Sequence, residues 1–228
     1  MKKSPLLLTL LATTALFVFS PGNTAAQSVQ NMNGKVFKQQ TVYSEVSGSP
    51  YLYTDWNKGI VQLSDGKVVD NLEIKFDQIA EVVLYKNERE EELEVAEPVK
   101  QFQIKTKGVF RTFRSGFKPV GNNTESNFYE VLADGNVKFI KKIKKDIMSQ
   151  REYNATSDTK TITEKLTYYI VKDNQPILVA KNEKAILAAI GDKTDALTAF
   201  IKQNKLNLKD DSDIVAVLDH YNSIAKAG

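Results

Sequence analysis

Few residues in this 228-residue chain have the types and spacing that catalysis needs. His220 is the only histidine and there is no cysteine, which excludes most nucleophilic triads and the usual zinc sites. On the expected last helix, His220 lies about 120° from the apolar stripe, so we predict that it points into solvent. Residues 64–67 (SDGK) and 115–118 (SGFK) match the serine–lysine pattern of penicillin-recognising enzymes, but both are turn sequences and not helix starts. We therefore expect no nucleophilic serine.

Acidic side chains are the remaining route to catalysis, because a glycosidase needs only two carboxyl groups placed across a sugar. Glutamates are plentiful in residues 88–97. That segment is typical of a charged hairpin tip, where a carboxyl group stays in water and lacks the burial that a working acid needs. Asp210, Asp211 and Asp213 do not have the spacing of a calcium loop and are better explained as a helix start. These patterns predict no catalytic residue, no bound metal and no cofactor.

Residues 49–59 (SPYLYTDWNKG) place two tyrosines and the only tryptophan within six positions. In an extended segment Tyr51 and Tyr53 lie on one face and Leu52 on the other, and Trp56 comes just before a turn. Exposed rings in this arrangement would bind a sugar, whereas half-buried rings would close the open end of a sheet. We favour the closing role, because a chain without disulfides depends on its core. Tyr51, Tyr53 and Trp56 are nevertheless kept as candidate ligand-binding residues.

Two basic segments could bind an anion. Arg111 and Arg114 stand among phenylalanines beside a polar loop and are the better candidates, since guanidinium groups bind carboxylate and phosphate through paired hydrogen bonds. A denser group, five lysines and Arg151, lies in residues 138–151. It would cover one side of a strand or a helix and could meet anionic lipid or an acidic polysaccharide. For this second group we favour ion pairs with the glutamate-rich residues 88–97.

The middle of the chain has the pattern of a β-sheet. From Lys58 onward, apolar and polar residues alternate and turn sequences interrupt them, as in half-buried antiparallel strands. Asp-Gly pairs at 65–66 and 134–135 predict tight turns between such strands. We expect about eight to ten locally connected strands in residues 35–181, with no helical stretch long enough for a parallel crossover. The result would be a meandering antiparallel sheet, curled or sandwich-like.

After Asn182 the period of the apolar residues changes from two to about 3.6. One apolar stripe ends at Gly191, a second follows it, and a last helix should begin near Asp211, where carboxylates favour a helix N-terminus. We predict two or three short helices in residues 183–227, packed on the sheet. The predicted fold class is therefore α+β, with residues 27–228 forming a single domain.

The first 26 residues have the features of a signal peptide. Lys2 and Lys3 precede an apolar run from Leu6 to Phe19, and small residues follow as far as Ala26. The run is shorter than the roughly 20 residues that a membrane helix needs, and no later segment is long enough. Cleavage after Ala26 would leave 29 basic against 28 acidic side chains, so the charge does not indicate a nucleic-acid partner. We predict an exported protein, periplasmic or extracellular, without a transmembrane segment.

The chain resembles a group of exported proteins of unknown function that are common in Bacteroidota. The resemblance lies in GSPYLYTDWNKGIVQLSDGK, FRSGF, FYEVLADG and the tail from Leu197 to Ile224. It implies a bacterial envelope or extracellular setting, and it implies no catalytic residue.

Three functions follow as hypotheses. The one that we favour is a non-enzymatic envelope protein that binds an envelope component or a glycan through its sheet or loops. The second is a carbohydrate-active hydrolase, which requires two carboxyl groups facing each other across a cleft. The third is a carrier, which requires an apolar cavity of roughly 300 Å³ or more between the sheet and the C-terminal helices.

Overall fold

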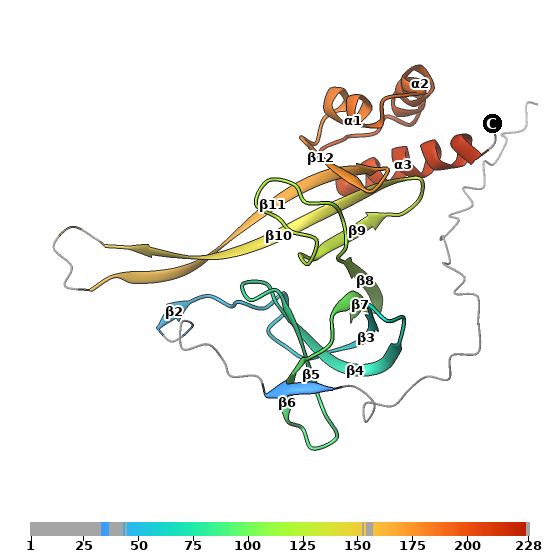
Figure 1. Ribbon diagram of the computed structural model, residues 1–228. Coiled ribbons are helices and arrows are strands. Elements are labelled where there is room, and N and C mark those ends of the chain that lie inside the picture. Colours follow the sequence, from blue (N-terminus) through green and yellow to red (C-terminus); the bar gives the residue numbers. More distant parts are fainter. Residues whose placement is uncertain (1–32, 37–42, 44, 152, 154–156, 227–228) are drawn as a thin grey trace, which may run out of the picture.

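The computed structural model describes residues 33–36, 43, 45–151, 153 and 157–226, and the predicted signal peptide lies outside them. Within these residues twelve strands form one sheet, and three helices follow (Figure 1). The predicted α+β class, a largely antiparallel sheet followed by C-terminal helices, is confirmed. The strands are β1 (Gly34–Val36), β2 (Val46–Ser47), β3 (Asn57–Leu63), β4 (Val68–Asp77), β5 (Val82–Lys86), β6 (Glu92–Val95), β7 (Val99–Thr106), β8 (Val109–Arg114), β9 (Tyr129–Ala133), β10 (Val137–Gln150), β11 (Thr159–Lys172) and β12 (Gln175–Val179). The helices are α1 (Glu183–Ile190), α2 (Thr194–Asn204) and α3 (Asp211–Lys226).

The sheet is a meander with three pairings between strands that are distant in the sequence: β1 with β6, β3 with β7 and β2 with β11. Its strand order is β1-β6-β5-β4-β3-β7-β8-β9-β10-β11-β12. Strands β3 to β6 follow one another as hairpins, and β7 then returns to pair with the other edge of β3. From β7 to β12 each strand pairs with the next. Strand β2 pairs with β11 in parallel, a pairing that the predicted antiparallel meander did not contain.

The two predicted Asp-Gly turns are both present. Gly66 turns β3 into β4 with a φ of 95°, a conformation that glycine adopts without steric cost. The second turn joins β9 to β10, and its glycine has a different reason for being there. A Cβ atom added to Gly135 would lie 2.4 Å from the side-chain nitrogen of Asn222 on α3, so this glycine allows the helix to approach the turn.

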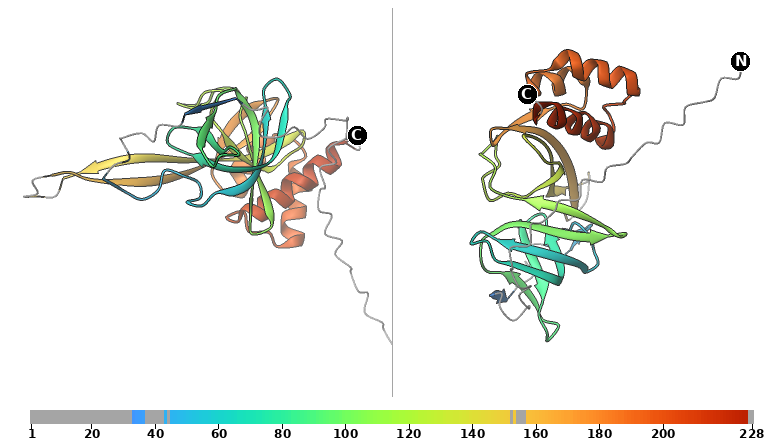
Figure 2. Two further views of the ribbon diagram at one scale, coloured as in Figure 1. Left: turned by 90° about the horizontal axis from the view of Figure 1, so that it is seen from below. Right: turned by 90° about the vertical axis from the view of Figure 1, so that its right-hand side faces the viewer.

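Strands β10 and β11 form a long hairpin that extends well beyond the body of the molecule (Figures 1 and 2). Each strand has 14 residues, and the two pair without a break from Val137 opposite Lys172 to Gln150 opposite Thr159. Near the body the hairpin is buried, with Phe139 and Ile170 fully inaccessible, whereas residues 148–150 and 159–161 are exposed. The apolar half of the hairpin therefore belongs to the core, and the polar half projects.

Two main cores hold the fold together. The first lies within β3 to β8 and centres on Phe76, Phe102, Phe113 and Phe128, whose contacting rings have centroids between 4.9 and 5.9 Å apart. The second lies between β9 to β12 and the helices. Helix α3 packs on β9 and β10, α1 packs on β11 and β12, and α2 packs on the other two helices (Figure 2). The helices thus cover one end of the sheet and bury their apolar stripes there.

The helix boundaries follow the sequence signals, but the position of His220 does not. Asn182 caps α1 by accepting a hydrogen bond from the backbone of Ala185 at 2.9 Å, and Gly191 ends the helix with a φ of 88°. The prediction that His220 points into solvent is wrong. Its side chain is partly buried and stacks on Phe200 of α2, with ring centroids 4.1 Å apart. The helical period of α3 does not reveal this contact, because Phe200 belongs to a different helix, α2.

Candidate functional site

A groove of about 630 Å³, lined by polar and apolar side chains, lies between the sheet and α3, and we call it the α3 groove. Three adjacent strands supply its floor through the side chains of Gln62, Gln101, Gln103, Phe110, Thr112 and Arg114. The last three residues of β9 and the side chains of Asp134, Val215 and Asp219 complete it. Its lining includes Arg114, one of the residues that the sequence proposes for ligand binding. A smaller cavity of about 320 Å³ is also lined by Arg114.

Strand alternation explains why these polar side chains share one face. In the register of the sheet Gln62 lies opposite Gln101, Gln101 lies opposite Arg114, and Gln103 lies opposite Thr112. Their neighbours in sequence, such as Phe102 and Phe113, point to the other face and fill the first core. Because side chains on a strand alternate between faces, burying the phenylalanines leaves a continuous polar surface across β3, β7 and β8.

The side chains on the floor of the groove use only some of their hydrogen-bond donors and acceptors with one another. Gln103 donates its side-chain amide to the Thr112 hydroxyl at 3.1 Å, and its side-chain carbonyl has no donor among the described residues. Gln101 accepts from the Arg114 guanidinium at 2.8 Å, and its side-chain nitrogen has no acceptor within the same part of the chain. A side-chain amide carries both functions, so the floor presents donors and acceptors side by side. A ligand hydroxyl group has the same dual character.

Two carboxyl groups in the groove have pKa values displaced in opposite directions. Burial alone would raise the pKa of Asp134, but its hydrogen bond and ion pair with Arg114, at 2.8 Å, and the nearby ammonium group of Lys138 lower it below the usual value. The pKa of Asp219 on α3 is raised by partial desolvation beside the groove, although the residue as a whole is exposed, and Asp219 has no ion pair in the described residues. Asp134 is therefore held ionised, while Asp219 is the more easily protonated of the two.

The rim of the groove carries an exposed aromatic ring. Phe110 is 45% exposed, and the ammonium group of Lys105 lies 5.5 Å from the centre of its ring. Across the groove, Val215 of α3 offers an apolar surface that is only partly buried. A sugar can place its apolar face on an aromatic ring such as Phe110 while its hydroxyl groups form hydrogen bonds with the neighbouring side-chain amides.

The remaining predicted ligand-binding residues lie in two other places. The rings of Tyr51 and Trp56 both contact the Lys75 ammonium group, at 5.1 and 4.9 Å from their centres, and Lys86 lies 5.5 Å from the Trp56 ring. All three aromatic side chains of the segment, Tyr53 included, are half-buried. The structure thus gives Tyr51 and Trp56 cationic partners within the protein, and their binding of an external ligand stays a prediction.

Tyr53 and Arg111 are brought together in the interior. The Arg111 guanidinium donates to the Tyr53 hydroxyl and forms two hydrogen bonds with Glu130, at 2.6 and 2.7 Å. Glu130 also pairs with Lys141 at 2.9 Å, and Lys141 reaches Asp211 at the start of α3. Arg111 is therefore one end of a chain of charges that joins β8, β9, β10 and α3. Its charge is already compensated by Glu130.

The lysine-rich segment has internal partners, but not those that its sequence suggests. Residues 138–151 belong to β10 and its exposed end, and their acidic partners are Glu81, Glu130, Asp134, Asp146, Asp158 and Asp211. The expected ion pairs with residues 88–97 are wrong. Those glutamates lie around β6, near one end of the strand order, whereas the lysines lie on β10, near the other end. The composition of the two segments does not show how far apart they lie in the sheet.

Sequence reasoning missed the glutamines, Thr112 and Asp219 as parts of a site. A signal was present, because Gln62, Gln101 and Gln103 occupy alternate positions beside apolar residues. Their convergence depends on the pairing of β3 with β7, in which Gln62 lies opposite Gln101, 39 residues away in the sequence. Each of these strands also has a hairpin partner nearer in sequence, β4 for β3 and β8 for β7. Asp219 reaches the same groove only because α3 packs on β9 and β10.

Comparison with protein-family models, with curated proteins and with solved structures yields no match. No helix in the described residues is both long and apolar enough to cross a membrane. Within the same residues, no three acidic or histidine side chains gather as they would around a metal ion.

Replacing Trp56 by alanine should destabilise the protein modestly. Because the indole is only half-buried and lies beside the ammonium groups of Lys75 and Lys86, we expect the free energy of unfolding to fall by about 1–2 kcal/mol, less than the 3–5 kcal/mol typical of a fully buried ring. Chemical denaturation followed by tyrosine fluorescence would measure it. An unchanged stability would contradict the closing role of this segment.

Proposed function

We propose that this protein is an exported, non-enzymatic binding protein of the cell envelope and that its ligand is a glycan held in the α3 groove. The observation that carries the proposal is the half-satisfied row of side chains on the groove floor, where Gln101 offers a donor beside the acceptor of Gln103. Sugar hydroxyls need both kinds of partner within a few ångströms. Export is inferred from the signal-peptide features of the first 26 residues.

The shape and surroundings of the groove support a glycan over an apolar ligand. The space between the sheet and the helices, where a carrier would need its cavity, is occupied by buried side chains such as Ile186, Leu197 and Leu218. The α3 groove is large enough for a saccharide of a few units and has polar groups along its floor. Phe110 stands at its edge as a stacking surface.

Glycan binding can be tested by screening the protein against an array of neutral and acidic glycans and measuring the best binder by calorimetry. Phe110→Ala should weaken binding about tenfold, since one aromatic contact contributes about 1.4 kcal/mol. Gln103→Ala should weaken it about three- to tenfold through the lost hydrogen bond. The stability of both variants should change little, because neither side chain is buried.

Val109→Ala is the matched control, because Val109 is the immediate neighbour of Phe110, is 66% exposed and does not line the α3 groove. Its affinity for the glycan should equal that of the unmodified protein. If no glycan on the array binds, or if the glycan binds Phe110→Ala and Gln103→Ala with unchanged affinity, the proposal is wrong.

One observation favours hydrolysis as a second candidate function. Asp134 and Asp219 line the same groove with pKa values displaced apart, which is the arrangement by which one carboxyl group serves as acid and the other as base. Incubation of the bound glycan with the protein, followed by an assay for new reducing ends, decides between the two. Release that is lost in Asp219→Asn while binding persists would establish the hydrolase; no release supports the binding protein.

A further inference from the structure

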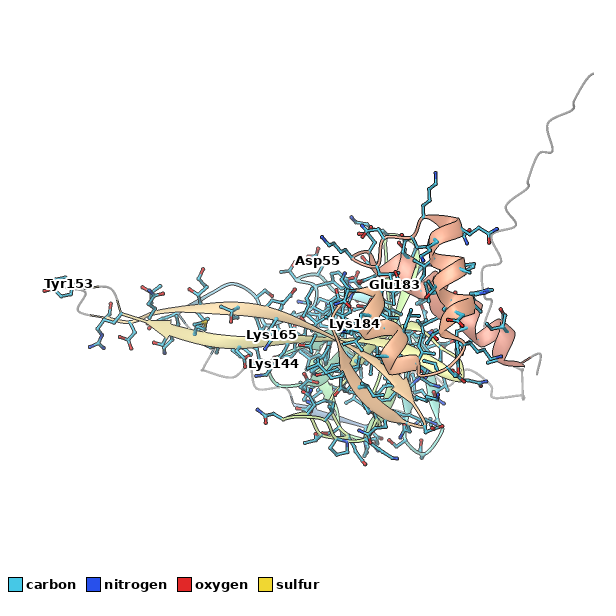
Figure 3. The ribbon with its side chains drawn as sticks, turned by 90° about the horizontal axis from the view of Figure 1, so that it is seen from above. Asp55, Lys144, Tyr153, Lys165, Glu183 and Lys184 are labelled. Atoms are coloured by element: carbon cyan, nitrogen blue, oxygen red, sulfur yellow. The ribbon has the colours of Figure 1, made fainter. Side chains whose placement is uncertain are left out.

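A second groove, of about 710 Å³, lies at the base of the long β10–β11 hairpin, and we call it the hairpin groove. Lys144 of β10 and Lys165 of β11 line it at the point where the hairpin leaves the body, as Figure 3 shows. The loop before β9 contributes Asn122, Asn123 and Asn127 to the groove. Gln78, which directly follows β4, also lines it. No residue of this groove lines the α3 groove.

The hairpin groove has an excess of positive charge. Lys144 lies directly opposite Lys165 in the register of the hairpin, so the two side chains share one face. Like charges that face each other across two strands repel and destabilise the pairing. Lys144 is relieved by Asp146 at 2.8 Å, whereas Lys165 forms no ion pair in the described residues. An anion between the two ammonium groups would remove the repulsion.

The other two lysines in the groove are already occupied. Lys142 is buried and pairs with Glu81, and it also donates to the backbone of Phe128 at 3.1 Å. Lys145 donates to the backbone oxygens of Ser49 and Tyr51 at 3.0 and 2.6 Å. These contacts hold the walls of the groove in place. The positive charge that is free to meet a ligand is therefore that of Lys165, with Lys144 beside it.

A buried acceptor in the same groove lacks a donor. Gln78 is 1% exposed, and its side-chain nitrogen donates to the backbone of Ile143 at 3.3 Å. Its side-chain oxygen is buried and has no hydrogen-bond partner among the residues that the structure describes. A buried polar atom without a partner destabilises the folded state, because it has lost its hydrogen bond to water. A ligand that supplies a hydrogen-bond donor would satisfy it.

The asparagines of the loop offer complementary groups. Asn127 uses its side-chain oxygen to accept from the backbone and hydroxyl of Thr124, at 2.7 and 3.2 Å, which leaves its amide nitrogen as a donor. Asn123 donates to the Tyr169 hydroxyl at 3.3 Å, which leaves its side-chain oxygen as an acceptor. Together with Gln78, they form a polar wall suited to hydroxyl groups, next to a pair of cations.

We propose that the hairpin groove binds an acidic saccharide, with the anionic group between Lys144 and Lys165 and a ligand hydroxyl donating to the side-chain oxygen of Gln78. A fully ionised inorganic anion has no donor for Gln78, and a neutral sugar has no charge for the lysines. A sugar that carries a carboxylate or sulfate satisfies both. The proposal stands on the hairpin groove alone and does not depend on glycan binding in the α3 groove.

The test is calorimetric titration of the protein with an oligosaccharide of glucuronic acid, with an oligosaccharide of glucose of equal length, and with sodium sulfate. At about 50 mM salt the glucuronic acid ligand should bind at least about tenfold more tightly than the other two. Its affinity should fall at about 500 mM salt, because exposed charges are then screened. Equal binding of the glucose ligand would overturn the requirement for charge. Equal binding of sulfate would overturn the requirement for hydroxyl groups.

Matched variants locate the site. Lys165→Gln should weaken the glucuronic acid ligand about three- to tenfold, while Lys184→Gln, which removes an exposed charge from α1, should leave its affinity unchanged. Equal loss in both variants would mean attraction to the overall charge and would overturn the proposal. Phe110→Ala separates the two grooves: if it abolishes binding of the acidic ligand, that ligand occupies the α3 groove and the hairpin-groove proposal is wrong, whereas unchanged binding supports it.

Discussion

Replacing Glu130 by alanine is expected to lower the free energy of unfolding by about 3–5 kcal/mol, a large part of the roughly 5–15 kcal/mol by which folded domains are usually stable. The residue is 5% exposed, and its carboxylate pairs with both Arg111 and Lys141. Removing it leaves two cations without their shared partner in a site from which water is largely excluded. Denaturation with urea, followed by circular dichroism, measures the change.

Glu125→Ala provides the comparison, because that glutamate is exposed and has no ion pair in the described residues. It should change the free energy of unfolding by less than about 0.5 kcal/mol. If Glu130→Ala is no more destabilising than Glu125→Ala, the charge chain from β8 to α3 contributes nothing to stability and the account given for Arg111 is wrong.

The same carboxylate makes the stability depend on pH. Burial alone would raise the pKa of Glu130, but hydrogen bonds and charges from Arg111 and Lys141 lower it below its ordinary value of 4.5. A lowered pKa means that the unfolded chain takes up the proton first as the pH falls. The stabilisation is therefore complete above about pH 4.5 and is lost as the pH falls through the pKa of the folded state. The difference in stability between the unmodified protein and Glu130→Ala should accordingly shrink between pH 7 and about pH 3.

Replacing Asn222 by alanine should cost about 2–4 kcal/mol, the second largest effect that we expect. The Asn222 side chain is buried at 7% exposure and forms two hydrogen bonds with one residue of β10. It accepts from the Val137 backbone nitrogen at 3.0 Å and donates to the Val137 backbone oxygen at 2.9 Å. Without the amide both backbone groups lose a partner in the interface between α3 and the sheet.

Hydrogen exchange distinguishes this role from a simple loss of volume. In Asn222→Ala the backbone amide of Val137 should exchange faster with solvent, together with the amides of α3, because the helix loses its polar attachment to the sheet. Gln203→Ala on α2, an exposed position, is the control and should leave both the exchange and the stability unchanged. Slow exchange at Val137 in the Asn222 variant would show that another group takes over the contact.

These two residues show where prediction from sequence stops. Glu130 is the one charged residue in the otherwise apolar segment 128–133, and that segment does not identify the cations that pair with it. Asn222 falls next to the predicted apolar face of α3 but carries no capping or turn signal. Both become important through partners 19 and 85 residues away, Arg111 and Val137. Patterns of period two or 3.6 report which face a residue occupies, and they do not identify what lies opposite.

The sequence by itself determined the class of the fold: alternating strands with Asp-Gly turns, a change of period after Asn182, and helix starts at Asn182 and Asp211. These features are local, because turn conformation, capping and side-chain alternation depend on a few neighbouring residues. Only the tertiary structure decided which strands became neighbours and where side chains met. The return of β7 to β3 made the floor of the α3 groove, the packing of α2 placed His220 on Phe200, and the long hairpin set Lys144 against Lys165. Such contacts depend on how the whole chain buries its apolar surface, and many sequences with the same local pattern would bury it differently.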